Sequence, residues 1–318
     1  MKYIFGPVPS RRLGLSLGVD LLPPKTCNMN CIYCELGPGK GTVCDIREYT
    51  PLSDIQAEIR HVCLEEPRDF DCLTFTASGE PTLYSRLGEL ILFARDVCGG
   101  RPIVVLTNAG LVHRKDVRDA LAQADFVLPS LDAVTGAVFR RINRPDPCIK
   151  LNDVIKGLVL LRQKMKGRMW LEILLVQGIN DSDQEIMALK KALAVIGPDR
   201  VQLNTVVRPP AEAFAKPVAR RRMEEIKDML GENAEIIVDY SRKLREGAPL
   251  MLESEILDML RRRPLSIQDM KKLFGGYRGI DELLARLMDN GVIARKRMGN
   301  QDFYCMFHDS PIDMAAAS

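Results

Sequence analysis

Short apolar segments alternate with helical patterns along the first three quarters of this chain. The apolar segments are rich in Val, Leu and Ile, as strands are when both of their faces are covered. Strands that alternate with helices form repeated βα units and therefore a parallel sheet. Six such units in about 240 residues predict an α/β fold, a partial (βα)6 barrel with six of the eight repeats of a full barrel. The expected strands are 15–21, 72–76, 103–107, 126–130, 170–176 and 201–206.

Several helix ends are also legible. Ser53 with Gln56, and Ser182 with Glu185, have the spacing of a capping box, in which a side chain at each position bonds the backbone of the other. Glycine pairs or Gly-Pro steps at 99–100 and 197–198 predict where helices stop.

Composition limits the classes of protein to which the chain can belong. At 318 residues it is too long for one ordinary domain, although a barrel can exceed 200 residues as a unit. A net charge of +3 gives no argument for binding nucleic acid or a membrane. No apolar run reaches the ~18 residues of a transmembrane helix, and the N-terminus lacks a signal peptide's pattern. Nine cysteines, an odd number with one tight cluster, indicate a reducing compartment, so we expect a cytoplasmic protein.

The pattern changes after Tyr240. Residues 242–249 are typical of a linker, and helical patterns follow at 253–262, 266–274 and 279–290. A strand, a turn at 298–301 and a second strand come next. Three helices and a two-stranded ribbon predict a small winged helix-turn-helix domain. The expected organisation is a barrel over 1–245, a winged helix-turn-helix over 250–308 and a flexible tail over 309–318.

The sequence leaves the partner of the winged helix open. Its one basic cluster is Arg295, Lys296 and Arg297, on the wing, whereas the third helix carries more acidic than basic residues. Such a helix is a poor face for a phosphate backbone. Nucleic-acid binding, docking of a protein or peptide, and structural packing all stay as alternatives.

Three cysteines lie within eight residues, Cys27, Cys31 and Cys34, in the spacing C-x3-C-x2-C. Thiolates are the ligands that iron–sulfur clusters take. A [4Fe–4S] cluster with three protein ligands leaves one iron open, and an open position marks a reactive centre. A zinc site that lacks its fourth ligand, or a group of surface thiols, would be the alternative.

This motif, with the aromatic Tyr33 before its last cysteine, resembles the signature of the radical SAM superfamily. The resemblance implies a [4Fe–4S] cluster whose open iron binds S-adenosylmethionine (SAM). An electron from the cluster then cleaves SAM to a 5′-deoxyadenosyl radical. It implies an electron donor of the flavodoxin or ferredoxin type as well, and it places Tyr33 at the cofactor.

In βα barrels the chemistry lies at the carboxyl ends of the strands. The second expected strand is followed by Ser78, Gly79 and Glu80, which with the next proline resemble the superfamily's GGEP element, with serine in place of the first glycine. In the family this element binds the amino group of SAM. Thr107 follows the third strand, and Ser130 follows the fourth in a run similar to the family's SLDA segment.

By this resemblance Ser130 binds SAM, and Thr107 binds SAM or substrate. Alternatively these residues cap the helices that follow, and the glycine belongs to a plain loop. Glu172 and Asn204, on the fifth and sixth strands, are further candidates without a role that the sequence assigns.

The run 5–20, and Arg208 with the two prolines after it, resemble radical SAM proteins related to wyosine synthases, which modify a guanine in transfer RNA. The archaeal wyosine synthases hold a second cluster through cysteines upstream of the triplet, and this chain has no cysteine before Cys27. Arg11 and Arg12 fit either a phosphate or carboxylate ligand or a solvated or salt-bridged pair. The other cysteines are scattered singly, so we expect one cluster per chain, and Cys63 and Cys72 fall at core positions. The scattered cysteines are Cys44, Cys63, Cys72, Cys98, Cys148 and Cys305.

Two function classes follow. The first is a radical SAM enzyme that modifies a macromolecular substrate, either an RNA base in a wyosine-like reaction or a peptide, docked by the winged helix. The second is a regulator that senses oxygen or iron through its cluster and binds DNA. A sensor does not require the Gly79–Glu80 element, which favours the enzyme.

Overall fold

The structure is a computed structural model that describes residues 1–10, 12–237, 253–274, 279–299 and 301–307. The chain divides into two compact units, Met1–Arg242 and Lys243–Ser318. The predicted linker at 242–249, the predicted tail and Arg11 lie outside the described residues.

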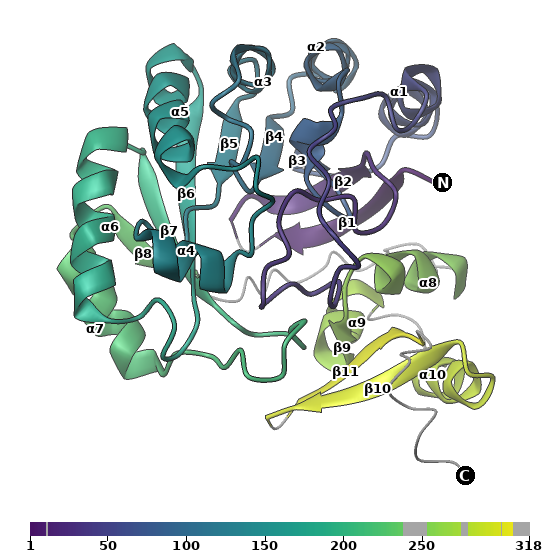
Figure 1. The fold of residues 1–318 in the computed structure, drawn as a ribbon. Coiled ribbons are helices and arrows are strands. Elements are labelled where there is room, and N and C mark those ends of the chain that lie inside the picture. Colours follow the sequence, from purple (N-terminus) through teal and green to yellow (C-terminus); the bar gives the residue numbers. More distant parts are fainter. Residues whose placement is uncertain (11, 238–252, 275–278, 300, 308–318) are drawn as a thin grey trace. The chain divides into compact units, whose positions relative to one another are not determined.

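An eight-stranded sheet forms the frame of the first unit (Figure 1), and its strands follow one another in chain order. β1 pairs antiparallel with β2, and every later neighbour pairs in parallel. The strands are β1 (Ile4–Ser10), β2 (Gly14–Asp20), β3 (Cys72–Thr76), β4 (Ile103–Thr107), β5 (Phe126–Pro129), β6 (Arg168–Leu175), β7 (Arg200–Thr205) and β8 (Ala234–Ile236).

Helices cover the outer face of this curved sheet, as α1, α2, α3, α5, α6 and α7 show in Figure 1. Because these connections leave one strand and return to the next parallel strand, the unit is the α/β partial barrel that the alternating pattern predicts. The helices are α1 (Leu52–Arg60), η1 (His61–Glu65), η2 (Pro81–Leu83), α2 (Leu87–Val97), α3 (Lys115–Leu121), α4 (Gly136–Ile142), α5 (Leu151–Lys164), α6 (Asp183–Ile196) and α7 (Arg220–Leu230).

One apolar cluster joins four successive strands. Its buried members are Cys72, Val104, Leu128 and Trp170, one each from β3 to β6. Phe126 packs against it, with its ring centroid 4.8 Å from that of Trp170. Burial of such side chains, at roughly 25 cal/mol per Å², holds the strands together and leaves their carboxyl ends to carry polar loops.

The second unit contains α8 (Glu253–Arg262), β9 (Leu265–Ser266), α9 (Ile267–Phe274), α10 (Ile280–Asp289), β10 (Ile293–Met298) and β11 (Gln301–Met306). β11 lies between β10 and β9 in a three-stranded antiparallel sheet. The winged helix-turn-helix assignment stays a prediction. Among the described residues of both units, no helix has the length and apolar character needed to cross a membrane.

Candidate functional site

The cysteine motif lies on the long loop between β2 and α1. Cys27, Cys31 and Cys34 are free thiols, and each is partly buried. Burial raises the pKa of Cys27 to about 12 and raises that of Cys31 further, with the Asp132 carboxylate contributing to the second shift. The charge of Cys34 adds to both shifts.

The spacing of these sulfur atoms separates a cluster from a single ion. Ligands of one zinc ion at 2.3 Å lie about 4 Å from one another. Among the described residues, the three motif sulfurs are not a group whose ligand atoms all lie within 4.8 Å of one another. Three thiolates on one loop whose sulfur atoms lie farther apart than the ligands of one ion fit a multi-iron cluster, in which each thiolate binds its own iron. The donor set therefore fits a [4Fe–4S] group better than the zinc alternative.

Backbone hydrogen bonds fix the loop from several sides. The amide of Asn30 donates to the carbonyl of Asn143 over 3.1 Å, and that of Ile32 donates to Ile142 over 3.0 Å. Farther along the loop, the amide of Val43 returns to donate to the carbonyl of Cys27 over 2.8 Å. These contacts hold the motif in place without using its sulfur atoms.

The segment after β3 packs directly against the start of the motif. The amide of Glu80 donates to the carbonyl of Thr26 over 3.0 Å, and a β-bridge joins Thr26 to Gly79. A methyl group on Gly79 would overlap the carbonyl oxygen of Thr26. Ser78 is held by Asp20 at the end of β2, whose carboxylate accepts from the amide over 2.7 Å and the hydroxyl over 2.6 Å. The structure thus brings Ser78, Gly79 and Glu80 together with the cysteine loop.

The Glu80 carboxylate is the centre of a buried hydrogen-bond network. Its Oε1 accepts from the Thr107 hydroxyl over 2.6 Å and from both the hydroxyl and the amide of Thr82. Its Oε2 accepts from the amide of Asn108 over 2.6 Å. Burial raises the pKa of Glu80, and these hydrogen bonds oppose the shift. Thr107 therefore contacts Glu80. It does not cap the next helix, α3, whose N-cap residue is Arg114.

Tyr33 reaches across to the residues that follow β5. Its hydroxyl donates to Asp132 Oδ2 over 2.5 Å, and the Asn143 side-chain amide donates to the same oxygen over 2.7 Å. The other oxygen of Asp132 accepts from the amide of Leu174 over 2.8 Å. Burial raises the pKa values of both Tyr33 and Asp132. The Tyr33–Asp132 pair ties the motif to β5 and β6, a function that the sequence did not reveal for Asp132.

Ser130, which follows β5, lies beside Glu172, within β6, and Glu172 in turn contacts Asn204, near the end of β7. A β-bridge joins Ser130 to Glu172, and the Asn204 side-chain amide donates to Glu172 Oε1 over 3.1 Å. The other Glu172 oxygen forms an ion pair with Arg12. Arg12 is thus part of an ion pair, one of the two alternatives that the sequence left open, and Arg208 lies 3.6 Å from Glu35 beside the motif.

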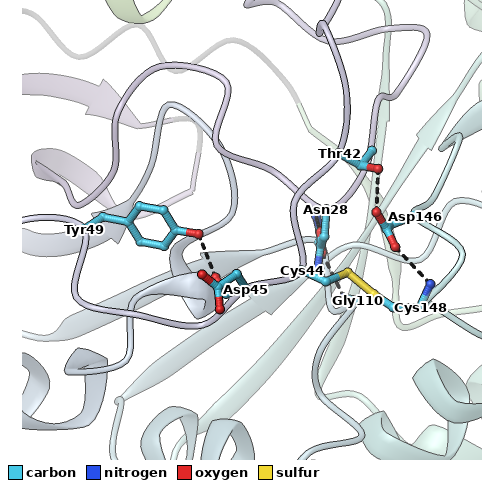
Figure 2. The surroundings of a disulfide bond; sticks show 9 residues. Asn28, Thr42, Cys44, Asp45, Tyr49, Gly110, Asp146 and Cys148 are labelled. Atoms are coloured by element: carbon cyan, nitrogen blue, oxygen red, sulfur yellow. Dashed lines mark hydrogen bonds between the residues drawn. A yellow bond between two sulfur atoms is a disulfide. The ribbon is translucent and has the colours of Figure 1, made fainter.

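Two pairs among the scattered cysteines are close in space. Cys44 and Cys148 form a disulfide across a sequence separation of 104 residues (Figure 2). Asp146 lies beside it, accepting from the Thr42 hydroxyl over 2.6 Å and from the amide of Cys148 over 2.9 Å. These cysteines stand singly in the sequence, and the folding of the loops brings Cys44 and Cys148 together. Cys63 and Cys98 also meet, 2.9 Å apart, while Cys63 and Cys72 are buried as predicted.

Several residues of this site are not marked by a local spacing motif in the sequence. Asp20, Asp132 and Asn143 act through partners that lie more than 10 positions away, so no local spacing marks them. Two sequence features indicated where these residues lie. Asp20 is the last residue of β2, and Asp132 belongs to the run Ser130–Asp132 after β5, and the chemistry of a barrel lies at such strand ends.

This chain is similar to known proteins in sequence. A family model described as the Radical SAM superfamily matches residues 21–189. A protein of Brachyspira hyodysenteriae named GTPase Obg is 36% identical over 296 residues, which is 92% of this chain and 43% of that protein. The UPF0026 protein MJ1312 of Methanocaldococcus jannaschii is 30% identical over 312 residues, 96% of either chain. The chain thus spans less than half of the first relative and nearly all of the second.

Solved structures share the fold. TYW1 with a lysine-pyruvate adduct bound superposes with a TM-score of 0.54 and 18% identity, covering 70% of this chain and 75% of that one. Streptococcus suis SuiB bound to its precursor peptide SuiA gives a TM-score of 0.54 and 16% identity, covering 71% and 50%. At these identities the likeness is one of fold.

Proposed function

This chain belongs to the radical SAM superfamily, and we propose that Cys27, Cys31 and Cys34 hold the [4Fe–4S] cluster that its members use with SAM. The chain is accordingly an enzyme of that superfamily. The observation that carries the ligand assignment is the group of three free thiols on the one loop that follows the carboxyl end of β2. No fourth cysteine belongs to this loop before Cys44, which is joined to Cys148 instead.

The residues around the motif receive SAM. When bound, the cluster and SAM together supply the one-electron chemistry of the reaction. Glu80 Oε2 accepts only the Asn108 amide among the described residues, which leaves acceptor capacity for a cationic amino group. Thr107 holds that carboxylate in place. Because Gly79 has no side chain, its backbone lies against Thr26, next to the first cysteine of the motif. The Ser130 hydroxyl has no hydrogen-bond partner among the described residues and is available to SAM, while Tyr33 fixes the motif from the other side.

A change at Glu80 tests this assignment. We expect Glu80→Gln to weaken SAM binding at least tenfold, because its neighbours are all donors and an amide can accept on only one of its two ends. Anaerobic equilibrium dialysis measures the affinity, and SAM-induced change in the electron paramagnetic resonance (EPR) spectrum of the reduced cluster reports binding beside the iron. The exposed Glu232→Gln is the matched control. Equal affinities in both variants would remove Glu80 from the SAM site.

The substrate is a macromolecule, either an RNA base in a wyosine-like reaction or a peptide. The second unit supports this proposal, since Arg295, Lys296 and Arg297 are exposed in succession on β10 and suit docking of a large partner. The names of the two fold neighbours, one with a lysine-pyruvate adduct and one with a precursor peptide, are compatible with either choice. An electron donor of the flavodoxin or ferredoxin type and a cytoplasmic location complete the proposal.

A further inference from the structure

Each of the three motif cysteines accepts a hydrogen bond from the side-chain nitrogen of a different residue. Lys25 Nζ donates to Cys34 Sγ over 3.2 Å. The side-chain amides of Asn108 and Asn143 donate to Cys27 Sγ and Cys31 Sγ, each over 3.5 Å. The donors come from three places, namely the motif loop, the end of β4 and the end of α4.

The two asparagine amides are held by their other hydrogen. Asn108 Nδ2 also donates to Asn28 Oδ1 over 2.6 Å, and Asn28 is fully buried. Asn143 Nδ2 also donates to Asp132 Oδ2 over 2.7 Å, and the Tyr33 hydroxyl oxygen lies as far from it as Cys31 Sγ does, at 3.5 Å. An amide nitrogen carries two hydrogens, so the bond to oxygen leaves the second hydrogen of Asn108 for sulfur, and that of Asn143 for sulfur or for the Tyr33 oxygen.

Lys25 is fixed in a similar way. Its backbone has φ of 63°, a conformation that a residue other than glycine rarely adopts, and its amide donates to the carbonyl of Ser78 over 2.5 Å. Its ammonium group also donates to the carbonyl of Gly37, in the turn that follows Cys34. A half-buried cation is therefore held against one motif sulfur.

Donors of this kind stabilise the more negative, reduced form of an iron–sulfur centre, because they withdraw charge from the ligating sulfur. In a site shielded from water both the hydrogen bonds and the lysine charge act more strongly than they would in solvent. We propose that Lys25, Asn108 and Asn143 act through the three thiolates to raise the reduction potential of the cluster. This inference rests on the proposed ligand assignment.

Redox titration of the reconstituted protein tests it. Lys25→Met keeps the aliphatic stem but removes the donor and the charge, so the midpoint potential should move to more negative values. Asn108→Ala should move it in the same direction by less, since a neutral donor is lost. Lys25→Arg should restore the wild-type potential. Lys40→Met, an exposed lysine on the same loop, should leave the potential unchanged.

The readout is the EPR signal of the reduced cluster in an anaerobic dye-mediated titration, with iron content measured on the same samples. An unchanged potential in an iron-replete Lys25→Met protein overturns the inference while leaving the ligand assignment intact. If the wild-type chain binds no cluster, the proposed function fails first. If the Lys25→Met protein loses its iron, resonance Raman spectra of the wild-type cluster test whether donors bond the ligating sulfur atoms. Fe–S(Cys) bands that shift on transfer to D2O support the inference, and bands that stay fixed overturn it.

Discussion

At the residue scale, the packing of the site allows only glycine at position 79. The backbone of Gly79 lies against Thr26, at the start of the cysteine loop, and the space that a Cβ would take is already filled by a carbonyl group. A backbone atom cannot move aside as the end of a side chain can. The glycine is therefore needed for steric reasons alone.

Gly79→Ala should push the cysteine loop away from β3. Overpacking of this kind costs about 1–3 kcal/mol of stability, and we expect the iron bound per chain to fall as well. The matched control is Gly41→Ala on the same loop, because a Cβ there meets no atom within 4 Å. Iron analysis after anaerobic reconstitution, together with thermal unfolding, measures both effects. Equal iron content in the two variants would mean that the contact with Thr26 does not position the motif.

Some residues of the site follow from the sequence and others do not. The cysteines and the Ser78–Glu80 segment are recognisable because their spacing is local. Asp132 and Asn143 are not, because their contacts to Tyr33 and Cys31 span 99 and 112 positions. Only the folded barrel places those partners together.

At the scale of elements, strands that are buried on both faces were the most predictable. All six expected strands correspond to β2 through β7, and the boundaries of β3 and β4 agree at both ends. β1 and β8 were missed, since β1 is interrupted by glycine and prolines and β8 has only three residues.

The two capping boxes had different outcomes. Ser182 does accept from the amide of Glu185 over 3.3 Å, but the Glu185 carboxylate binds Val134 and Thr135 instead of returning to Ser182. The box at Ser53 is wrong, because α1 begins at Leu52 with no side-chain cap. Tertiary partners decide which of the possible side-chain bonds form.

The Cys44–Cys148 disulfide joins two loops that both contact the cysteine motif. Closing a loop of about 100 residues stabilises a protein by about 4.7 kcal/mol in the chain-entropy model. The Cys44→Ser/Cys148→Ser double variant should therefore unfold roughly 10 °C below the wild type without reductant. Cys305→Ser, a partly buried thiol of the second unit, serves as control.

Thermal unfolding with and without a phosphine reductant measures this contribution. The reductant should bring the wild type down to the double variant and leave the variant itself unchanged. Identical unfolding temperatures in the absence of reductant would show that the two cysteines do not pair in solution.

At the scale of the whole molecule, the chain contains two compact units, and every residue that we assign to the cluster or to SAM belongs to the first. A protein ending at Arg245 should therefore bind iron and cleave SAM slowly without substrate. It should lose most of its turnover on the native substrate, because a docking module raises the effective concentration of the reacting group. Full activity of the shortened protein would make the second unit a bystander, and loss of its iron would place the boundary elsewhere.

Charge reversal on β10 identifies the kind of partner. Replacing Arg295, Lys296 and Arg297 with glutamate should reproduce the loss of turnover seen on truncation. The dependence on salt should be steep for a nucleic acid, since each phosphate contact releases counterions, and shallow for a peptide. Turnover is compared between 50 and 200 mM salt with wild type as reference.

The formation of 5′-deoxyadenosine tests the central claim most directly. The chain is reconstituted anaerobically with iron and sulfide, reduced, and incubated with SAM, and the products are separated by liquid chromatography. We predict about four irons per chain and release of 5′-deoxyadenosine and methionine in equal amounts. The Cys27→Ala/Cys31→Ala/Cys34→Ala variant should show neither iron nor product, whereas Cys305→Ala should behave as wild type. Release of 5′-deoxyadenosine by the triple variant would contradict the assignment of these three cysteines.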